Sequence, residues 1–304
     1  MEPFRVHILG CGSALPTLRH NPSSQVVEVR GKMFMVDCGE GTQLQLRRVK
    51  VRFTKVSAVF ISHLHGDHCF GLIGMISTFG MLGRTAALHI YAYKDLEDIL
   101  KRQIDYFCTG LEYEIIFHAI DPTVQQVIYE DRSLTVETVP LRHRVPCCGF
   151  IFREKPTLPH IRRDMFDCYE IPISQVNNIK NGADWTTPDG EFVPNSRLTI
   201  PADPPRSYAY CSDTKYFDAL AQEVKGVSTL YHEATYDSAN DARAKLYNHS
   251  TARQAATVAR DAGVGQLVIG HFSARYEEEN LLLDEAKEVF SNTVLADERK
   301  IIEI

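Results

Sequence analysis

The stretch ISHLHGDHCFG, residues 61–71, places three histidines and an aspartate within six positions: His63, His65, Asp67 and His68. It continues the apolar run SAVFIS, whose composition predicts a buried strand. Imidazole nitrogens together with a carboxylate form a ligand set suited to zinc or a similar transition metal. Alternation along the strand end points His63 and His65 the same way, and the tight turn after them brings Asp67 and His68 to a neighbouring point. The spacing therefore predicts two adjacent metal ions at the end of a strand.

The bulk composition excludes several classes of protein. Of the 304 residues, 44% are hydrophobic and 24% are charged, which is typical of a globular chain rather than a disordered one. The net charge of -6 argues against indiscriminate binding to polyanions but leaves room for a local basic patch. The first residues lack a signal peptide, and no segment approaches the roughly 18 apolar residues of a membrane span. Eight scattered cysteines without an export signal predict reduced thiols in the cytoplasm.

Strand signals recur in both halves of the chain, as β-branched or alternating runs. The predicted strands are RVHILG, SQVVEV, KMFMVDCG, SAVFISH, ALHIYA, YEIIFHAI, TVQQVIYE and LTVETVPL in the first half, then SYAYCSD, TLYHEAT and QLVIGHF. Two strand-rich halves, each with helices, predict an α/β fold in which two sheets pack face to face with helices outside.

Helices are predicted between these strands. One spans about 68–81, one begins near Asp95, and ENLLLDEAKEVF forms another near the end of the chain. A further helix begins at about Thr251, where Thr251 and Gln254 fit a capping box, and Gly263 fits its stop.

A proline-rich region, about 152–206, interrupts this pattern. It holds eight of the fourteen prolines and shows no clean period over most of its length. Such composition predicts loops and short elements. We therefore expect a single domain over 1–304 with an arm-like insertion at about 152–206.

Motifs spread over nearly the whole chain resemble one family. In order they are ILGCGSALPT, FMVDCGEGTQLQL, SHLHGDH, VPLRHRVPCCGF, YAYCSDT, HEATY, NHSTARQAA and VIGHFSARY. SHLHGDH matches the H-x-H-x-D-H signature of the metallo-β-lactamase superfamily, and the full set resembles ribonuclease Z, the tRNA 3′-processing endonuclease, in its short bacterial form. The resemblance implies a metallo-β-lactamase fold, a four-layer αββα sandwich, and precursor tRNA as substrate.

The resemblance also implies a complete ligand set for two zinc ions per chain. One zinc takes His63, His65 and His143, the other takes Asp67, His68 and His271, and Asp213 bridges them. Asp213 and His271 both follow predicted strands, as a site at a sheet edge requires. Judged from its motif LRHR alone, His143 is the weakest of these assignments, because LRHR could be merely a basic loop. Asp37, in FMVDCGEG, resembles a residue that braces the ligand loop rather than a ligand.

Catalytic roles follow from the same comparison. Two metals can activate a hydroxide that attacks the phosphodiester and leaves a 3′-hydroxyl on the tRNA. Asp67 fits the proton acceptor, and Glu233 with His249 fits a pair that protonates the leaving oxygen. On the residues alone, His249 would be a solvent-facing residue at a helix start. Among the isolated histidines, His20, near the ALPT loop, is a candidate for the edge of the site.

RNA contacts are expected where cations gather. The acid-free strip RRVKVRFTK supplies Arg47, Arg48, Lys50 and Arg52, although a solvated helix end and loop explains it equally well. In the insertion, HIRRD offers Arg162 and Arg163, but the Gly/Pro-rich arm tip typical of bacterial relatives is missing. The resemblance further implies a homodimer.

Other activities fit the first motif too. A phosphodiesterase of the same superfamily, acting on small phosphodiesters or RNA 3′ ends, is the main alternative. A thioester or β-lactam hydrolase is less favoured, because HEAT and HST suit phosphodiester chemistry. A non-catalytic RNA-binding relative is disfavoured because every ligand position is filled.

Overall fold

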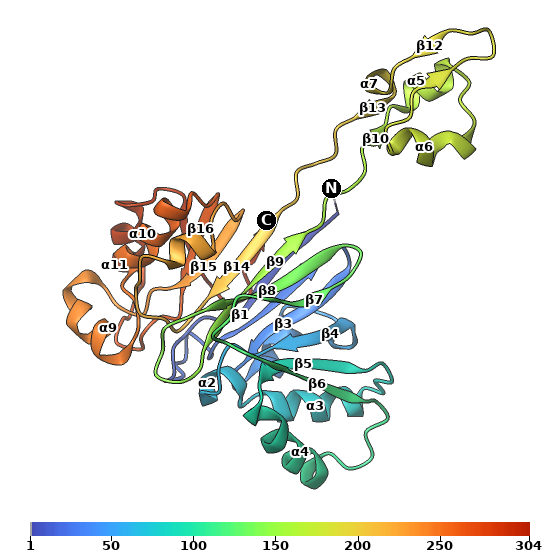
Figure 1. Cartoon of the computed structure of the whole chain (residues 1–304). Coiled ribbons are helices and arrows are strands. Elements are labelled where there is room, and N and C mark those ends of the chain that lie inside the picture. Colours follow the sequence, from blue (N-terminus) through green and yellow to red (C-terminus); the bar gives the residue numbers. More distant parts are fainter. Residues whose placement is uncertain (1) are drawn as a thin grey trace. The chain divides into compact units, whose positions relative to one another are not determined.

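The computed structural model describes residues 2–304 (Figure 1). It divides into two compact units, one of Glu2–Arg153 with Arg206–Ile304 and one of Glu154–Pro205. None of the helices in residues 2–304 has both the length and the apolar character that a membrane span requires.

Two seven-stranded sheets build the larger unit. The first sheet, in spatial order, contains β18 (Ile301–Glu303), β1 (Phe4–Gly10), β2 (Ser24–Val29), β3 (Lys32–Cys38), β4 (Val56–Phe60), β5 (Leu88–Tyr93) and β6 (Ile115–Ile120). The second contains β17 (Thr293–Leu295), β16 (Gln266–Gly270), β15 (Thr229–Glu233), β14 (Ser207–Cys211), β9 (Cys148–Glu154), β8 (Leu134–Pro140) and β7 (Val127–Glu130). Strands β3 to β6 are parallel, and so are β14 to β17, so each sheet gathers several carboxyl ends at one edge.

Aromatic side chains fill the space between the two sheets. The rings of Phe60 in β4 and Phe150 in β9 lie 5.5 Å apart, and those of Phe34 in β3 and Phe152 in β9 lie 5.8 Å apart. All four side chains are fully buried. The strands alternate, so each large residue that points inward is followed by one that points to the helical layer.

Helices cover the outer faces of both sheets. The helices of this unit are α1 (Thr42–Arg48), α2 (Gly66–Cys69), α3 (Leu72–Met81), α4 (Asp95–Phe107), α8 (Leu220–Glu223), α9 (Asp241–Tyr247), α10 (Ala252–Ala262) and α11 (Asn280–Lys287), with 3-10 turns η1 (Phe53–Lys55) and η3 (Ser238–Asn240). Ile76 and Phe79 of α3 pack in one core cluster with Val59 of β4, while Ala255 of α10 packs in the other with Val268 of β16. The layers run helix, sheet, sheet, helix, which confirms the predicted αββα sandwich.

Local predictions for α10 are confirmed. The Thr251 side chain accepts a hydrogen bond from the Gln254 amide, and the Gln254 side chain accepts one from the Thr251 amide. Gly263 ends the helix in the left-handed region, at φ 63°. Sequence alone was sufficient here because every partner lies within the helix and its caps.

The prediction of a single helix over about 68–81 was wrong. The chain forms α2 and α3 instead, and the amide of Gly71 donates to the carbonyl of Cys38 at 2.9 Å rather than to the preceding helical turn. A Cβ at Gly71 would lie 2.1 Å from the carbonyl oxygen of Gly39, so the interruption presses the backbone of the metal loop against the loop after β3. Strand β4 also ends at Phe60, earlier than expected.

The smaller unit consists of short elements, as the proline-rich sequence predicted. Its elements are β10 (His160–Ile161) paired with β13 (Thr199–Ile200), β11 (Trp185–Thr186) paired with β12 (Phe192–Val193), helices α5 (Arg163–Cys168), α6 (Val176–Lys180) and α7 (Asn195–Leu198), and the turn η2 (Ile173–Gln175). A separate apolar cluster of Phe166, Ile171, Ile179, Val193 and Leu198 forms its core.

Candidate metal centre

Loops that follow strand ends bring all the predicted ligands together. The loop after β4 carries His63 and His65, the short helix α2 that follows it carries Asp67 and His68, and the loop after β8 carries His143. Asp213 follows β14, and His271 directly follows β16. The ligand atoms fall into two main groups, each within 4.8 Å: His63, His65, His143 and Asp213 in one, and Asp67, His68 and His271 in the other.

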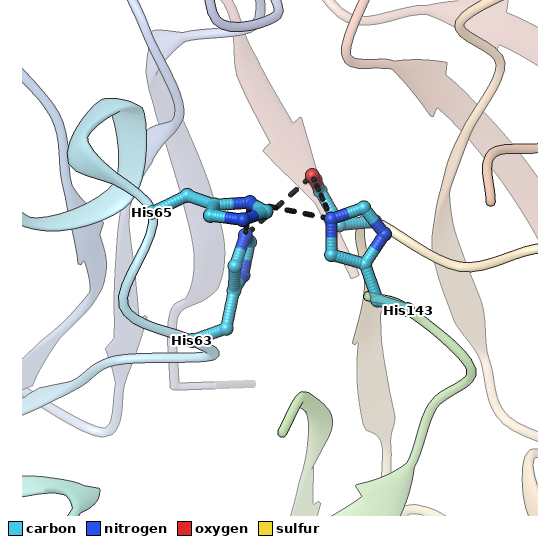
Figure 2. A group of neighbouring side chains, drawn as sticks. His63, His65 and His143 are labelled. Atoms are coloured by element: carbon cyan, nitrogen blue, oxygen red, sulfur yellow. Dashed lines mark hydrogen bonds and ion pairs between the residues drawn. The ribbon is translucent and has the colours of Figure 1, made fainter. Parts of the chain in front are cut away.

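In the first group, three imidazoles point toward one another (Figure 2). Nδ1 of His65 lies 3.0 Å from Nε2 of His63 and 3.3 Å from Nε2 of His143. Oδ2 of Asp213 lies 3.6 Å from Nε2 of His63 and 3.7 Å from Nε2 of His143. Three ring nitrogens and one carboxylate oxygen thus surround a single point.

The second group uses the other oxygen of the same aspartate. Oδ1 of Asp213 lies 3.2 Å from Nε2 of His68 and 3.0 Å from Nε2 of His271. Oδ2 of Asp67 lies 3.4 Å and 3.8 Å from the same two nitrogens. Asp213 therefore presents one oxygen to each group, which is the arrangement of a bridging carboxylate.

Hydrogen bonds decide which ring nitrogen each histidine can offer. In four of the five imidazoles Nδ1 has an oxygen partner: Ser62 Oγ for His63 (3.0 Å), Asp37 Oδ2 for His68 (2.7 Å), the Asn248 carbonyl for His143 (3.1 Å) and Thr235 Oγ1 for His271 (2.9 Å). A proton on Nδ1 leaves the Nε2 lone pair free for a metal. His65 is the exception, since its Nδ1 faces the group.

Two buried ring nitrogens without hydrogen-bond partners indicate whether a cation fits between the ligand groups. Nε2 of His68 and Nε2 of His271 are shielded from solvent and have no hydrogen-bond partner. Both lie close to Asp213 Oδ1, but neither is aligned to hydrogen-bond with it. Leaving a polar group unpaired in the interior costs about 1–3 kcal/mol. A cation among these nitrogens and carboxylates would satisfy them, and the N/O donor set fits zinc.

Asp37 holds the metal loop in place. Its buried carboxylate accepts hydrogen bonds from the Ser62 amide (2.8 Å), from the Tyr210 hydroxyl (2.7 Å) and from Nδ1 of His68. These contacts confirm the bracing position expected for Asp37, since the carboxylate orients one imidazole of the second group.

Backbone strain marks three residues of the centre. Asp37, Asp213 and His271 have φ values of 55°, 54° and 59°, although none is a glycine. The left-handed region is unfavourable for such residues, and they persist there when surrounding contacts enforce it, often at functional sites. Each lies at or just beyond a strand end, so the turn redirects its side chain into the centre.

Glu233 and His249 form a buried pair beside the ligands. Nδ1 of His249 donates to Oε1 of Glu233 at 2.9 Å, and the amides of Thr214 (2.6 Å) and Ser250 (3.0 Å) also donate to this carboxylate. Burial acts to lower the pKa of His249, but the charge of Glu233 and the hydrogen bond to it outweigh burial and raise that pKa to about 9. The His249 side chain is only 13% exposed, so the alternative of a solvent-facing histidine was wrong.

A cavity of about 490 Å³ opens onto both groups of ligands. Besides His249 and most of the ligands, its lining includes two arginines and two tyrosines that the sequence did not single out: Arg144, Arg243, Tyr236 and Tyr247. Arg243 and Tyr247 are four residues apart on α9, and they therefore share a helix face. The sequence offers two signals for them: Arg144 adjoins His143, and α9 directly precedes His249.

Known proteins resemble this chain in sequence over its whole length. Residues 4–159 match the family model described as "Anti-Pycsar protein Apyc1". Ribonuclease Z of Phocaeicola vulgatus is 59% identical over 304 residues, covering 100% of this chain and 98% of that one. Ribonuclease Z of Porphyromonas gingivalis is 48% identical over 304 residues and covers 100% of both chains.

The chain belongs to the ribonuclease Z family. The matched family model spans only the first half, whereas the ribonuclease Z relatives match throughout.

Solved structures agree with the fold of this ribonuclease Z family member. Human tRNase Z, short form, superposes with a TM-score of 0.71 at 24% identity and covers 98% of each chain. The metallo-β-lactamase fold protein YhfI from Bacillus subtilis superposes with a TM-score of 0.69 at 20% identity and covers 100% of each. Both likenesses confirm the metallo-β-lactamase fold.

The four basic residues predicted near 47–52 lie outside the cavity lining. Arg47 and Arg48 lie at the end of α1, and Lys50 and Arg52 lie in the loop after it; all four are exposed. Arg162 and Arg163 belong to the smaller unit, where Arg162 pairs with Asp164 at 3.1 Å.

Proposed function

We propose that this ribonuclease Z family member is the endonuclease that removes 3′ trailers from precursor tRNA and leaves a 3′-hydroxyl on the tRNA. Full-length relatives at 48–59% identity carry the name ribonuclease Z, which makes the chain a phosphodiester hydrolase. The main structural support for two-metal hydrolysis is the position of Asp213, because its two carboxylate oxygens face two separate groups of imidazoles.

The proposed cofactor is two zinc ions per chain. His63, His65 and His143 would hold one ion, Asp67, His68 and His271 the other, and Asp213 both. When bound, a pair of divalent cations lowers the pKa of water towards about 7 and stabilises the charge that develops on the phosphate. The free Nε2 atoms and the two unpaired buried nitrogens support this assignment.

Two side chains are proposed to move protons, and a third to position one of them. Asp67 lines the cavity and accepts a proton from the attacking water. His249 also lines the cavity and donates a proton to the leaving oxygen, while Glu233 fixes the ring through its 2.9 Å hydrogen bond. Because Glu233 raises the pKa of His249 to about 9, the imidazole carries its proton at neutral pH.

The RNA is proposed to enter along the arginines of the cavity. Arg144 and Arg243 are exposed, and neither has an ion pair or hydrogen bond within residues 2–304. Unpaired guanidinium groups beside the reacting centre suit phosphate oxygens. Tyr247, which is 40% exposed, offers a ring on which a base can stack.

The proposal also covers further tRNA contacts, the oligomeric state and the cellular compartment. Arg47, Arg48, Lys50 and Arg52 would contact the tRNA body, as would Arg162 and Arg163 in an arm-like insertion. A homodimer that works in the cytoplasm is the expected form, and the eight unpaired cysteines suit a reducing compartment.

Cleavage of a precursor tRNA tests the proposal. The purified chain with zinc should make one cut after the discriminator base of a transcript that carries a 3′ trailer. Asp67→Ala should abolish the cut, whereas Asp98→Ala, at an exposed acid on α4, should leave it unchanged. Turnover of small phosphodiesters alone, with the precursor left intact, would favour the alternative phosphodiesterase and overturn the proposal.

A further inference from the structure

A second group of metal-ligating side chains lies outside the catalytic centre. Cys11 follows β1, His20 lies in the loop between β1 and β2, and Glu298 lies between β17 and β18. Sγ of Cys11 is 3.3 Å from Nδ1 of His20, and Oε1 of Glu298 is 3.7 Å from the same nitrogen. One ligand atom from each residue falls within 4.8 Å of the others.

Burial separates this group from ordinary surface side chains. Cys11 is fully buried, and the side chains of Glu298 and His20 are 7% and 13% exposed. A thiol, an imidazole and a carboxylate that converge in the interior are the donors of a zinc site. We propose that Cys11, His20 and Glu298 bind a divalent cation of the zinc class, in addition to the cations of the catalytic centre.

The far nitrogen of His20 has the partner that a metal-bound imidazole uses. Nε2 of His20 lies 3.3 Å from Oε1 of Glu279, whose carboxylate also accepts a 2.6 Å hydrogen bond from Arg19. Histidines that bind metal commonly donate their second N–H to a carboxylate, which fixes the tautomer and the ring orientation. Nδ1 of His20 is thereby directed to Cys11 and Glu298.

The carboxylate of Glu298 is fixed as well. Nδ2 of Asn21 donates to its Oε2 at 2.7 Å, Nε2 of Gln45 donates to the same oxygen, and the backbone amide of Asn21 donates to Oε1. A carboxylate oxygen with one hydrogen bond keeps a second lone pair, and that of Oε1 can serve a cation. The carbonyl oxygen of Ala296, 3.7 Å from Cys11 Sγ, lies near enough to contribute a fourth donor.

This site would position part of the catalytic cavity. The amide of Phe272, the residue after His271, donates to the Cys11 carbonyl at 3.0 Å, and the Ser13 amide donates to the Phe272 carbonyl at 3.0 Å. Ser13 itself lines the cavity. A cation on Cys11 and His20 would therefore hold the loop that fixes the backbone beside His271.

Cobalt spectroscopy tests the proposal without relying on activity. The full chain is depleted of metal and reloaded with Co²⁺. The catalytic centre offers only nitrogen and oxygen ligands, so a near-ultraviolet thiolate-to-cobalt charge-transfer band would report Cys11 alone. We expect this band in the wild type and its loss in Cys11→Ser, with about one cobalt ion fewer bound per chain.

Control variants show whether the charge-transfer band comes from Cys11. Cys108→Ser replaces a buried thiol outside the group and should keep the band, and His20→Gln should weaken it while Cys11 remains. A folded wild type with no such band would reduce the group to a hydrogen-bonded cluster and overturn the proposal. A band that survives Cys11→Ser but disappears in Cys69→Ser, a thiol beside the His65 carbonyl, would overturn it too.

Discussion

At the scale of single residues, the five imidazoles of the metal centre differ in which nitrogen is free. His63, His68, His143 and His271 each bond through Nδ1 to an oxygen acceptor, whereas His65 turns its Nδ1 to the centre. Apart from Ser62, which directly precedes His63, these acceptors come from other strands and loops, so the tautomers and orientations of His68, His143 and His271 could not be predicted from the motif. The residue types and their spacing alone already indicated two metals.

His249→Ala should slow cleavage by about 10²–10⁴-fold, because the leaving oxygen then lacks its positioned proton donor. Metal content should stay unchanged, because the side chain of His249 is not the Nδ1 partner of any proposed histidine ligand. Single-turnover cleavage of a precursor tRNA, together with metal analysis of the same sample, measures both quantities. Loss of metal in this variant would show that His249 is a ligand instead.

Arg243, which lines the cavity, is expected to contribute to tRNA binding. Arg243→Ala should weaken tRNA binding and reduce the slope of log K against log salt by roughly 0.7–0.9, the effect of one lost phosphate contact. Arg260→Ala removes an exposed arginine of α10 that pairs with Asp261 at 2.8 Å, and it should change neither value. Binding at several salt concentrations measures the slope. Equal slopes for wild type and Arg243→Ala would exclude this contact.

At the scale of elements, close backbone contacts shape the metal loop. The break between α2 and α3 exists because the Gly71 amide bonds to Cys38, and Gly39 and Gly71 approach too closely for a side chain. Helical periodicity in the sequence could not reveal this, since the partner carbonyl belongs to another element. The capping box of α10 was predictable because its partners are local.

Gly71→Ala should lower the free energy of unfolding by about 1–3 kcal/mol, because the new Cβ meets backbone that cannot move aside. Metal affinity should fall with it, since Asp67 shares this loop. Gly74→Ala is the matched control within α3: its Cβ meets only the end of the Gln43 side chain, and alanine suits a helix. Denaturant unfolding compares the two. A Gly71→Ala protein as stable as the wild type would contradict this account.

At the scale of the whole molecule, the sandwich brings together residues far apart in the chain. His143, Asp213 and His271 were expected from a family resemblance, because only the packing of two sheets places them beside His63. Arg144 and Arg243 were missed for the same reason. Their positions next to His143 and just before His249 are local signals, but such a signal does not by itself separate a cation that lines a cavity from one on a solvated face.

An ion pair between the two sheets should make the free energy of unfolding depend on pH. Lys32 of β3 bonds to Asp131, which follows β7. Burial acts to raise the pKa of Asp131, but hydrogen bonds from Lys32 and Tyr129 hold it well below its usual range. The stabilisation is therefore present above the unfolded pKa of about 3.9 and is lost as pH falls through the folded pKa.

Urea unfolding of wild type and Asp131→Asn should show this dependence. The wild type should be more stable at pH 7, and the difference in unfolding free energy should shrink by pH 3. Loss of metal at acid pH affects both proteins and cancels in the difference. Asp98→Asn, at an exposed acid, should match the wild type at both values. A difference that does not change with pH would contradict the role of the ion pair.

The order of the ligands along the chain has a consequence for biosynthesis. His63, His65, Asp67, His68 and His143 lie in the first half of the chain, but Asp213 follows β14 and His271 follows β16, two strands of the second sheet in the later half. A growing polypeptide that has emerged only as far as His143 has no bridging carboxylate and an incomplete second group. On the proposed ligand set, we expect ribosome-bound fragments to be unable to cut RNA and the nuclease to become active only after translation has passed His271.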